Sequence, residues 1–196
     1  MLPTSLSLLD RLKAAKPDAP DWHQLQAIYL PLIQNWITRV LSIKDDSADI
    51  SQEVFLVVIR ELPTFNRQRD GAFRAWLRTI TFNRLRTYWK QKKRQPMTGL
   101  GYGDETDDLL ARLEDPASDL SLEWDRQHDR HVFQKLLASA RPDFGSTTWE
   151  AFQRFAIHGK PAAVVADELG ISVNAVLQAK SRILKRLREE AAGLID

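Results

Sequence analysis

A series of amide, hydroxyl and cationic side chains recurs at helical spacing near the C-terminal end of this 196-residue chain. On a helical wheel at about 100° per residue, these side chains share one side of a helix that Ser172 can cap. Amide and guanidinium groups can make paired hydrogen bonds to purine edges in the major groove, and Lys and Arg can contact phosphates. The pattern predicts a duplex-reading helix whose candidate DNA-binding residues are Ser172, Asn174, Gln178, Ser181, Arg182, Lys185, Arg186 and Arg188.

The other side of the same helix is apolar and indicates a face that packs on a core. This stripe consists of Val176, Ala179, Ile183 and Leu187, extended by Val173, Leu177 and Leu184. A shorter helix precedes it, with Ala166 small enough for close approach and Gly170 suited to the turn. This spacing predicts a helix-turn-helix. The ordinary alternative is a helical hairpin with a solvated polar face, and the basic composition favours DNA.

Charge is distributed very unevenly along the chain, although the net charge is only +2. Residues 60–94 hold 11 basic and two acidic side chains, a net charge of +9. Residues 104–129 hold 10 acidic and two basic side chains, a net charge of −8. Blocks of opposite charge indicate segments with separate functions. The chain has no cysteine, which excludes a disulfide framework, a thiolate zinc site and a cysteine nucleophile.

Residues 71–94 predict a helix that carries both aromatic and cationic side chains. Its expected core stripe is Phe73, Trp76, Leu77 and Ile80. The opposite face holds Phe82, Leu85 and Trp89 among Arg78, Arg86 and Lys93. Cations attract phosphates, and aromatic rings stack on unpaired bases. The alternative is that this helix is central in a bundle and that the second apolar set is buried as well.

Helical periodicity dominates the rest of the chain, and no alternating strand pattern is convincing. Further helices are expected over about residues 21–40, 46–62 and 120–140, and again from residue 147. Three glycines, two prolines and a cluster of acidic residues indicate a flexible acidic linker over residues 96–120. The predicted fold class is all-α, with two small helical domains, residues 1–95 and 121–196, joined by this linker.

Motifs for catalysis and for membrane insertion are missing from the sequence. There is no phosphate-binding glycine loop, no serine nucleophile elbow and no His-Glu-x-x-His. The longest apolar run, residues 54–59, is far shorter than the ~20 residues of a spanning helix. His128 and His131 lie one helical turn apart beside Asp125 and Asp129, so a metal site is conceivable, but an exposed charged helix is favoured. We expect a cytoplasmic protein that is not an enzyme and has no cofactor or metal.

Three stretches, in this order, resemble the sigma-70 family of bacterial RNA polymerase sigma factors, specifically its extracytoplasmic-function (ECF) group. Residues 46–55, DSADISQEVF, resemble the family's region 2 signature for gripping core polymerase. Residues 73–83, FRAWLRTITFN, resemble its promoter-melting helix, and residues 170–188 resemble its region 4 helix-turn-helix. The resemblance covers about residues 20–95 and 121–190, and the ordered combination is more specific than any one stretch.

The resemblance implies a transcription initiation factor that binds core RNA polymerase at the clamp region and the flap, recognises −35 and −10 promoter elements and promotes strand opening. An anti-sigma factor is a further partner that it allows. Carried over by position, the polymerase-binding residues are Asp46, Asp49, Gln52, Glu53 and Phe55. The −10 and melting residues are Phe65, Asn66, Arg67, Arg69, Arg78, Phe82, Asn83, Arg86, Trp89, Lys90 and Lys93. The resemblance implies that the helix-turn-helix residues named above bind the −35 element.

The recognition helix departs from the family pattern. Where relatives often carry Thr-Val-Lys-Ser-Arg, this chain has Ala-Val-Leu-Gln-Ala at residues 175–179, so base preference cannot be copied from them. The alternative function is a stand-alone helix-turn-helix transcriptional regulator with an unrelated N-terminal interaction domain. The basic aromatic helix and the acidic linker favour the sigma factor, because a stand-alone regulator requires neither.

Overall fold

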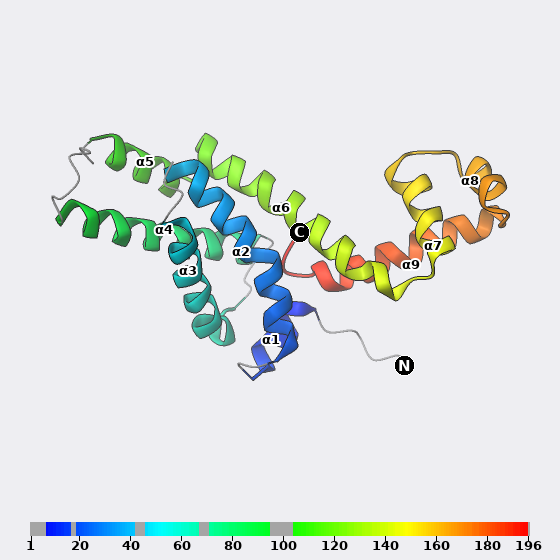
Figure 1. The fold of residues 1–196 in the computed structure, drawn as a ribbon, viewed down its shortest axis with the longest axis horizontal. Coiled ribbons are helices and arrows are strands. Elements are labelled where there is room, and N and C mark those ends of the chain that lie inside the picture. Colours follow the sequence, from blue (N-terminus) through cyan, green and yellow to red (C-terminus); the bar gives the residue numbers. More distant parts are fainter. Residues whose placement is uncertain (1–6, 17–18, 42–45, 67–70, 95–103, 196) are drawn as a thin grey trace.

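The computed structural model describes residues 7–16, 19–41, 46–66, 71–94 and 104–195, and these ranges are almost entirely helical (Figure 1). Within them no β-strand forms, so the all-α fold class is confirmed. The α-helices are α1 (Leu8–Ala14), α2 (Pro20–Leu41), α3 (Ser47–Glu61), α4 (Ala72–Arg94), α5 (Asp104–Glu114), α6 (Asp119–Ala140), α7 (Ser146–Phe152), α8 (Ala162–Leu169) and α9 (Val173–Ala191).

Serine hydroxyls cap three of these helices at their N-termini. The hydroxyl of Ser7 accepts a hydrogen bond from the backbone N–H of Asp10 at 3.3 Å, Ser118 accepts one from Ser121 at 3.1 Å, and Ser172 accepts one from Ala175 at 3.1 Å. Each bond satisfies one of the backbone donors that the first helical turn leaves unpaired. The helix boundaries at α1, α6 and α9 are therefore set by local sequence.

Helices α2, α3 and α4 pack against one another, with α1 beside α2, around a core of large apolar side chains. Leu25, Ile33, Val54 and Leu85 are completely buried there. Tyr29 of α2 meets Phe73 of α4 edge-to-face, with ring centroids 5.4 Å apart. Burying each such side chain contributes about 1.5–3 kcal/mol, so this core holds α3 and α4 in fixed relation.

The acidic segment is more ordered than its composition predicts. Residues 104–114, expected to lie in a linker, form helix α5, and α5 packs on both α4 and α6. The first half of α6 joins the N-terminal core through Trp124, which is completely buried, and Leu113 of α5 is buried with it. Asp108, Glu114 and Asp119 of these helices are exposed, while a sparse apolar stripe supplies the contact that stabilises them.

The C-terminal helices form a lobe at the opposite end of the molecule from α3 and α5 (Figure 1). A small core of Ala151, Val165, Ala166, Val176 and Ala179 holds α7, α8 and the start of α9 together. The second half of α9 runs beside α6 and returns the chain toward α1. There Arg11 makes an ion pair with Glu190 at 3.2 Å, which joins the two ends of the described chain.

Candidate nucleic-acid and polymerase interfaces

The turn between α8 and α9 has the geometry of a helix-turn-helix. The chain bends by 105° between the two helices, and Gly170 at the turn has a φ of 63°. Its neighbour Ile171 donates a backbone hydrogen bond to the Ala166 carbonyl at 3.0 Å, which closes the end of α8. A left-handed residue at this place favours glycine, because any side chain strains the backbone there. Val176 is completely buried in the angle between the helices.

The polar side of α9 faces outward, as its periodicity predicts. Asn174 and Gln178 are exposed one helical turn apart, at the end of α9 nearest the turn. The other exposed members of the predicted set are Ser172, Ser181, Arg182, Lys185 and Arg188. Their exposure leaves amide, hydroxyl and cationic groups available to a partner along the outer side of the helix.

Arg186 is the exception in this set, because ion pairs hold it against the protein. Its guanidinium bonds Asp143 at 3.0 Å and also pairs with Glu190. Burial would raise the pKa of Glu190, but hydrogen bonds from Arg186 and Arg11 outweigh it and lower that pKa. Arg186 therefore fastens α9 to the segment after α6, and its assignment as a DNA contact does not fit this arrangement.

Two apolar side chains of α9 are exposed where the helical wheel extended the core stripe. Val173 is 44% exposed and Leu177 is 46% exposed, whereas the true stripe, including Val176 and Ile183, is completely buried. The prediction that Val173 and Leu177 extend the buried stripe is wrong. Both lie at the edge of the apolar face of α9, and α8 covers only the centre of that face.

The basic face of α4 is paired with the acidic helices that follow it. Arg74 donates a hydrogen bond to Asp129 at 2.7 Å and makes an ion pair with Asp125 at 3.2 Å. Arg78 lies 3.6 Å from the same Asp125, and its side chain is only 11% exposed. Arg86 pairs with Glu114 of α5. Ion pairs therefore join the basic segment 60–94 to the acidic segment 104–129, and Arg74, which the helical pattern did not single out, contacts two of the carboxylates.

Phe82 and Trp89, the aromatic side chains expected on the open face of α4, are buried rather than presented to solvent. Phe82 is 7% exposed and Trp89 is 4% exposed, so the expectation of an open aromatic face is wrong for this structure. Phe82 stacks on Trp36 with centroids 5.3 Å apart, and Trp36 meets Trp124 of α6 edge-to-face at 4.9 Å. The core stripe of α4 packs on one side while α5 and α6 cover another, which a wheel for one helix cannot reveal.

The remaining −10 candidates differ in exposure. Asn66, Asn83 and Lys90 are exposed. Phe65 is half-buried, and its ring packs on Trp76 with centroids 4.8 Å apart. Arg67 and Arg69 lie outside the described residues, as does the side chain of Lys93.

The polymerase candidates of α3 form an exposed face with one misplaced member. Asp49, Gln52 and Glu53 are exposed, but Phe55 is 6% exposed and belongs to the core. The prediction of Phe55 as a surface contact is therefore wrong. Its neighbour Leu56 is 66% exposed and shares the face of Gln52 and Glu53. The spacing 49, 52, 53 and 56 on a helical wheel is the signal that finds it.

Asp46, the first polymerase candidate, is engaged with α4. Its carboxylate accepts a hydrogen bond from the Tyr88 hydroxyl at 2.5 Å and pairs with Lys92 at 3.2 Å. These two partners, Tyr88 first, lower the pKa of Asp46. Asp46 thus joins the start of α3 to the end of α4.

His128 is a buried hydrogen-bonded group between α6 and α2. Its Nδ1 lies 2.9 Å from an Asp129 carboxylate oxygen, and its Nε2 lies 3.2 Å from the Tyr29 hydroxyl. A carboxylate only accepts, so Nδ1–H donates to Asp129 and Nε2 accepts from Tyr29. Burial lowers the pKa of His128, although the hydrogen bond to Asp129 acts in the opposite direction. Burial also lowers the pKa of His131, and the Nε2–H of His131 donates to the Ile28 carbonyl at 2.7 Å. Within the described ranges, no group of three or more His, Cys, Asp or Glu side chains could hold a metal ion.

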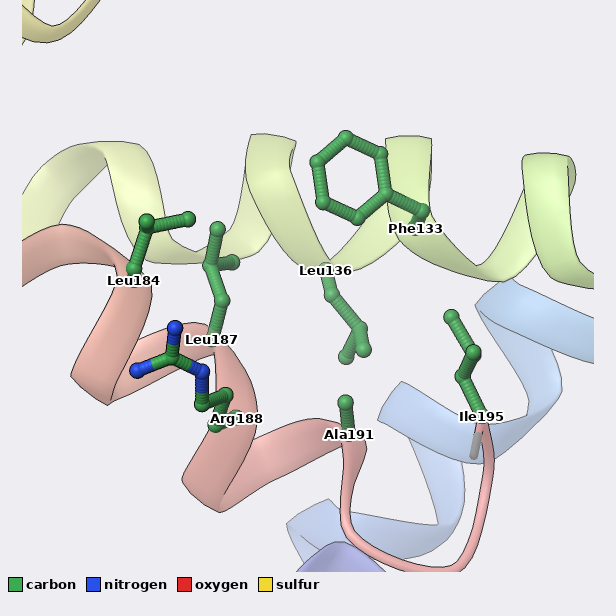
Figure 2. A pocket seen from close by; sticks show the side chains of 7 residues that line it. All are labelled: Phe133, Leu136, Leu184, Leu187, Arg188, Ala191 and Ile195. Carbon is green, nitrogen blue, oxygen red and sulfur yellow. The ribbon is translucent and has the colours of Figure 1, made fainter. Parts of the chain in front are cut away.

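An apolar groove of about 250 Å³ lies between α6 and α9 (Figure 2). Leu136 of α6 lies beside Leu187 and Ala191 of α9, and Ile195 closes one end. Phe133, Leu184 and Arg188 complete its lining. Phe133 is 39% exposed, so the groove opens to solvent.

The fold and these surfaces define an all-helical protein with a compact N-terminal bundle and, in α8 and α9, two helices that meet at a sharp turn and expose a polar face. Residues 25–95, which run from within α2 through α4, match the family model of Sigma-70 region 2. Sigma-70 region 2 is a domain of the sigma-70 family sigma factors, which are not enzymes but transcription initiation factors that bind core RNA polymerase. No curated protein matches the chain. In the part of the chain that the structure describes, no single helix is long and apolar enough to cross a membrane, although α8 and α9, sharply bent, satisfy that test together.

Proposed function

We propose that this chain is an ECF-group sigma factor that reads the −35 element with α8 and α9, binds the −10 element with α4 and the segment before it, and promotes strand opening. One observation carries the proposal. The region 2 domain is followed in the same chain by a helix-turn-helix whose outer face exposes amides and cations. Region 2 supplies the polymerase contact, and α9, the second helix of the helix-turn-helix, supplies the duplex contact. Such a factor acts in the cytoplasm, where the polymerase works.

The surface of α3 supports a contact with the polymerase clamp. Asp49, Gln52, Glu53 and Leu56 form one solvent-facing strip of α3 that combines three polar side chains with one exposed apolar side chain at its C-terminal end. For the flap, the groove between α6 and α9 offers a second apolar surface. These two contacts lie on different parts of the chain, so both can form at once.

The proposed role of α4 requires the acidic helices to move. Arg78 and Arg86 are paired with Asp125 and Glu114, so promoter phosphates must replace these carboxylates. Trp89 and Phe82 are buried, so they can stack on opened bases only after a rearrangement uncovers them, and Phe82 must also leave Trp36 of α2. We therefore propose that the described arrangement is that of the free protein, and that α5 and α6 leave α4 in the working complex.

Reconstitution with the cognate core RNA polymerase tests the proposal. The full chain is expected to co-elute with core enzyme and to support promoter-specific transcripts that core enzyme alone does not make. The variant Asp49→Ala is expected to weaken co-elution without changing the fold. Tight, specific duplex binding in the absence of polymerase, unaffected in Asp49→Ala, would identify the stand-alone regulator instead.

A further inference from the structure

The first two turns of α9 present apolar side chains at the place where a helix-turn-helix meets base edges. Val173 and Leu177, four residues apart, lie side by side on the helix and are 44% and 46% exposed. Asn174 and Gln178 are exposed next to them. These four side chains form the tip surface, the outer face of residues 173–178. Its composition differs from the rest of the helix.

Cations are absent from the tip surface and begin immediately after it. Residues 172–179 contain no charged side chain, whereas Arg182, Lys185 and Arg188 are exposed further along α9. Lys180 lies between the two parts, with its ammonium 5.2 Å from the centre of the Phe155 ring. Contacts to phosphates position a protein on DNA, while base identity is read by the N-terminal residues of the recognition helix. This division assigns the cations to the backbone and the tip surface to the bases.

The chemistry of the tip surface matches A·T pairs. In the major groove, guanine presents two acceptors that suit Arg or Lys, and the tip surface has neither. Adenine presents a donor and an acceptor that suit Asn or Gln, and thymine presents a C5-methyl group that suits an apolar side chain. Asn174 and Gln178 supply the amides, and Val173 and Leu177 supply the apolar contacts.

We propose that Leu177 and Val173 contact thymine C5-methyl groups in the −35 element, while Asn174 and Gln178 bond the neighbouring adenines. The chain then selects adjacent A·T pairs at this position. The inference rests on the proposed function, because it requires the tip surface to enter the major groove of a −35 duplex. Removal of one buried methyl group lowers affinity about fourfold, the factor that corresponds to about 0.8 kcal/mol.

Uracil substitution isolates the methyl group, because it removes that group and leaves base pairing unchanged. Holoenzyme assembled from the full chain and cognate core polymerase selects promoter fragments from a library randomised over the −35 region. The selected element is expected to contain adjacent A·T pairs. Each of its thymines is then replaced in turn by uracil, and fragment affinity is measured by competition. At one or two positions, uracil is expected to weaken binding about fourfold.

Variants then assign the effect to a side chain. Leu177→Ala is expected to bind thymine and uracil fragments equally, at the affinity that the wild-type holoenzyme has for uracil, and Val173→Ala is expected to do the same at a neighbouring thymine. Val164→Ala is the matched control, because Val164 on α8 is also 44% exposed but lies outside the tip surface. It is expected to keep the full discrimination. All three residues are exposed, so thermal unfolding should be unchanged.

The possible failures are distinguishable. If no −35 element is selected, the proposed function is wrong and the inference falls with it. If an element is selected but uracil replaces every thymine without loss, the inference alone is overturned. If Leu177→Ala weakens binding equally to thymine and uracil fragments, Leu177 contacts another protein or shapes the helix, and the methyl contact is rejected.

Discussion

Replacement of Trp124 measures how firmly the acidic segment is attached to the N-terminal core. Trp124 is completely buried, its ring meets Trp36 edge-to-face at 4.9 Å, and its indole N–H has no hydrogen-bond partner among the described residues. Trp124→Ala removes the largest buried side chain of α6 and leaves a cavity between α6 and α2. Such a change costs about 3–5 kcal/mol of unfolding free energy.

Trp124→Phe separates packing from polarity at the same position. Phenylalanine keeps much of the volume and removes the buried, unpaired N–H, whose desolvation costs about 1–3 kcal/mol. The two effects oppose each other, so Trp124→Phe is expected to change the unfolding free energy by less than about 1.5 kcal/mol. Leu122→Ala is the matched control on the same helix, because Leu122 is 50% exposed and its removal should change stability by no more than about 0.5 kcal/mol.

Equilibrium unfolding in urea, followed by circular dichroism at 222 nm, gives all three values. The expected order of destabilisation is Trp124→Ala far above Trp124→Phe, with Leu122→Ala near wild type. If Trp124→Ala unfolds within about 1 kcal/mol of wild type, α6 does not pack on the region 2 core in solution. The proposal that α5 and α6 mask α4 in the free protein would then lose its basis.

Three further predictions test separate parts of the structure. Leu56→Asp is expected to weaken binding to core polymerase at least tenfold with unchanged thermal unfolding, because Leu56 is 66% exposed, and an unchanged affinity would remove α3 from the interface. Gly170→Ala is expected to destabilise the chain by about 1–2 kcal/mol in thermal unfolding, since its φ is 63° although nothing lies within 4 Å of an added Cβ, and a neutral result would contradict that backbone conformation. The free energy of unfolding is expected to fall as the pH decreases from 7 to 5, because folding lowers the pKa values of His128 and His131 and the unfolded chain therefore binds more protons. His128→Gln should reduce the slope of unfolding free energy against pH, measured by urea unfolding at several pH values. An unreduced slope would show that His128 is not buried in its neutral form.

The sequence predicted the helices whose apolar periodicity or breakers are strong. Pro63 ends α3, and Gly170 separates α8 from α9, so these boundaries follow from the residues at the breaks themselves. Helix α5 was missed because its acidic residues and the glycines before it indicate a linker, while Leu113 is a weak signal alone. The acidic composition of α5 does not reveal its apolar contacts with α4 and α6, and these contacts stabilise the helix.

The candidate residues that proved misplaced share one physical cause. Phe55 and Leu56 are adjacent, and a rotation of 100° about α3 decides which of them is buried. Phe82 and Trp89 are covered because α4 packs on two sides, and Leu177 is exposed because α8 covers only part of α9. Periodicity gives the direction in which a side chain leaves its helix. How much of the helix surface a neighbouring helix buries is decided only by tertiary packing.

Start-site mapping with reconstituted polymerase tests the central claim most directly. Core RNA polymerase transcribes fragments of the source genome with and without the full chain, and the 5′ ends of the transcripts are mapped. We expect new start sites that depend on the chain and share paired sequence elements near −35 and −10, with adjacent A·T pairs in the upstream element. Transcripts identical with and without the chain would contradict it.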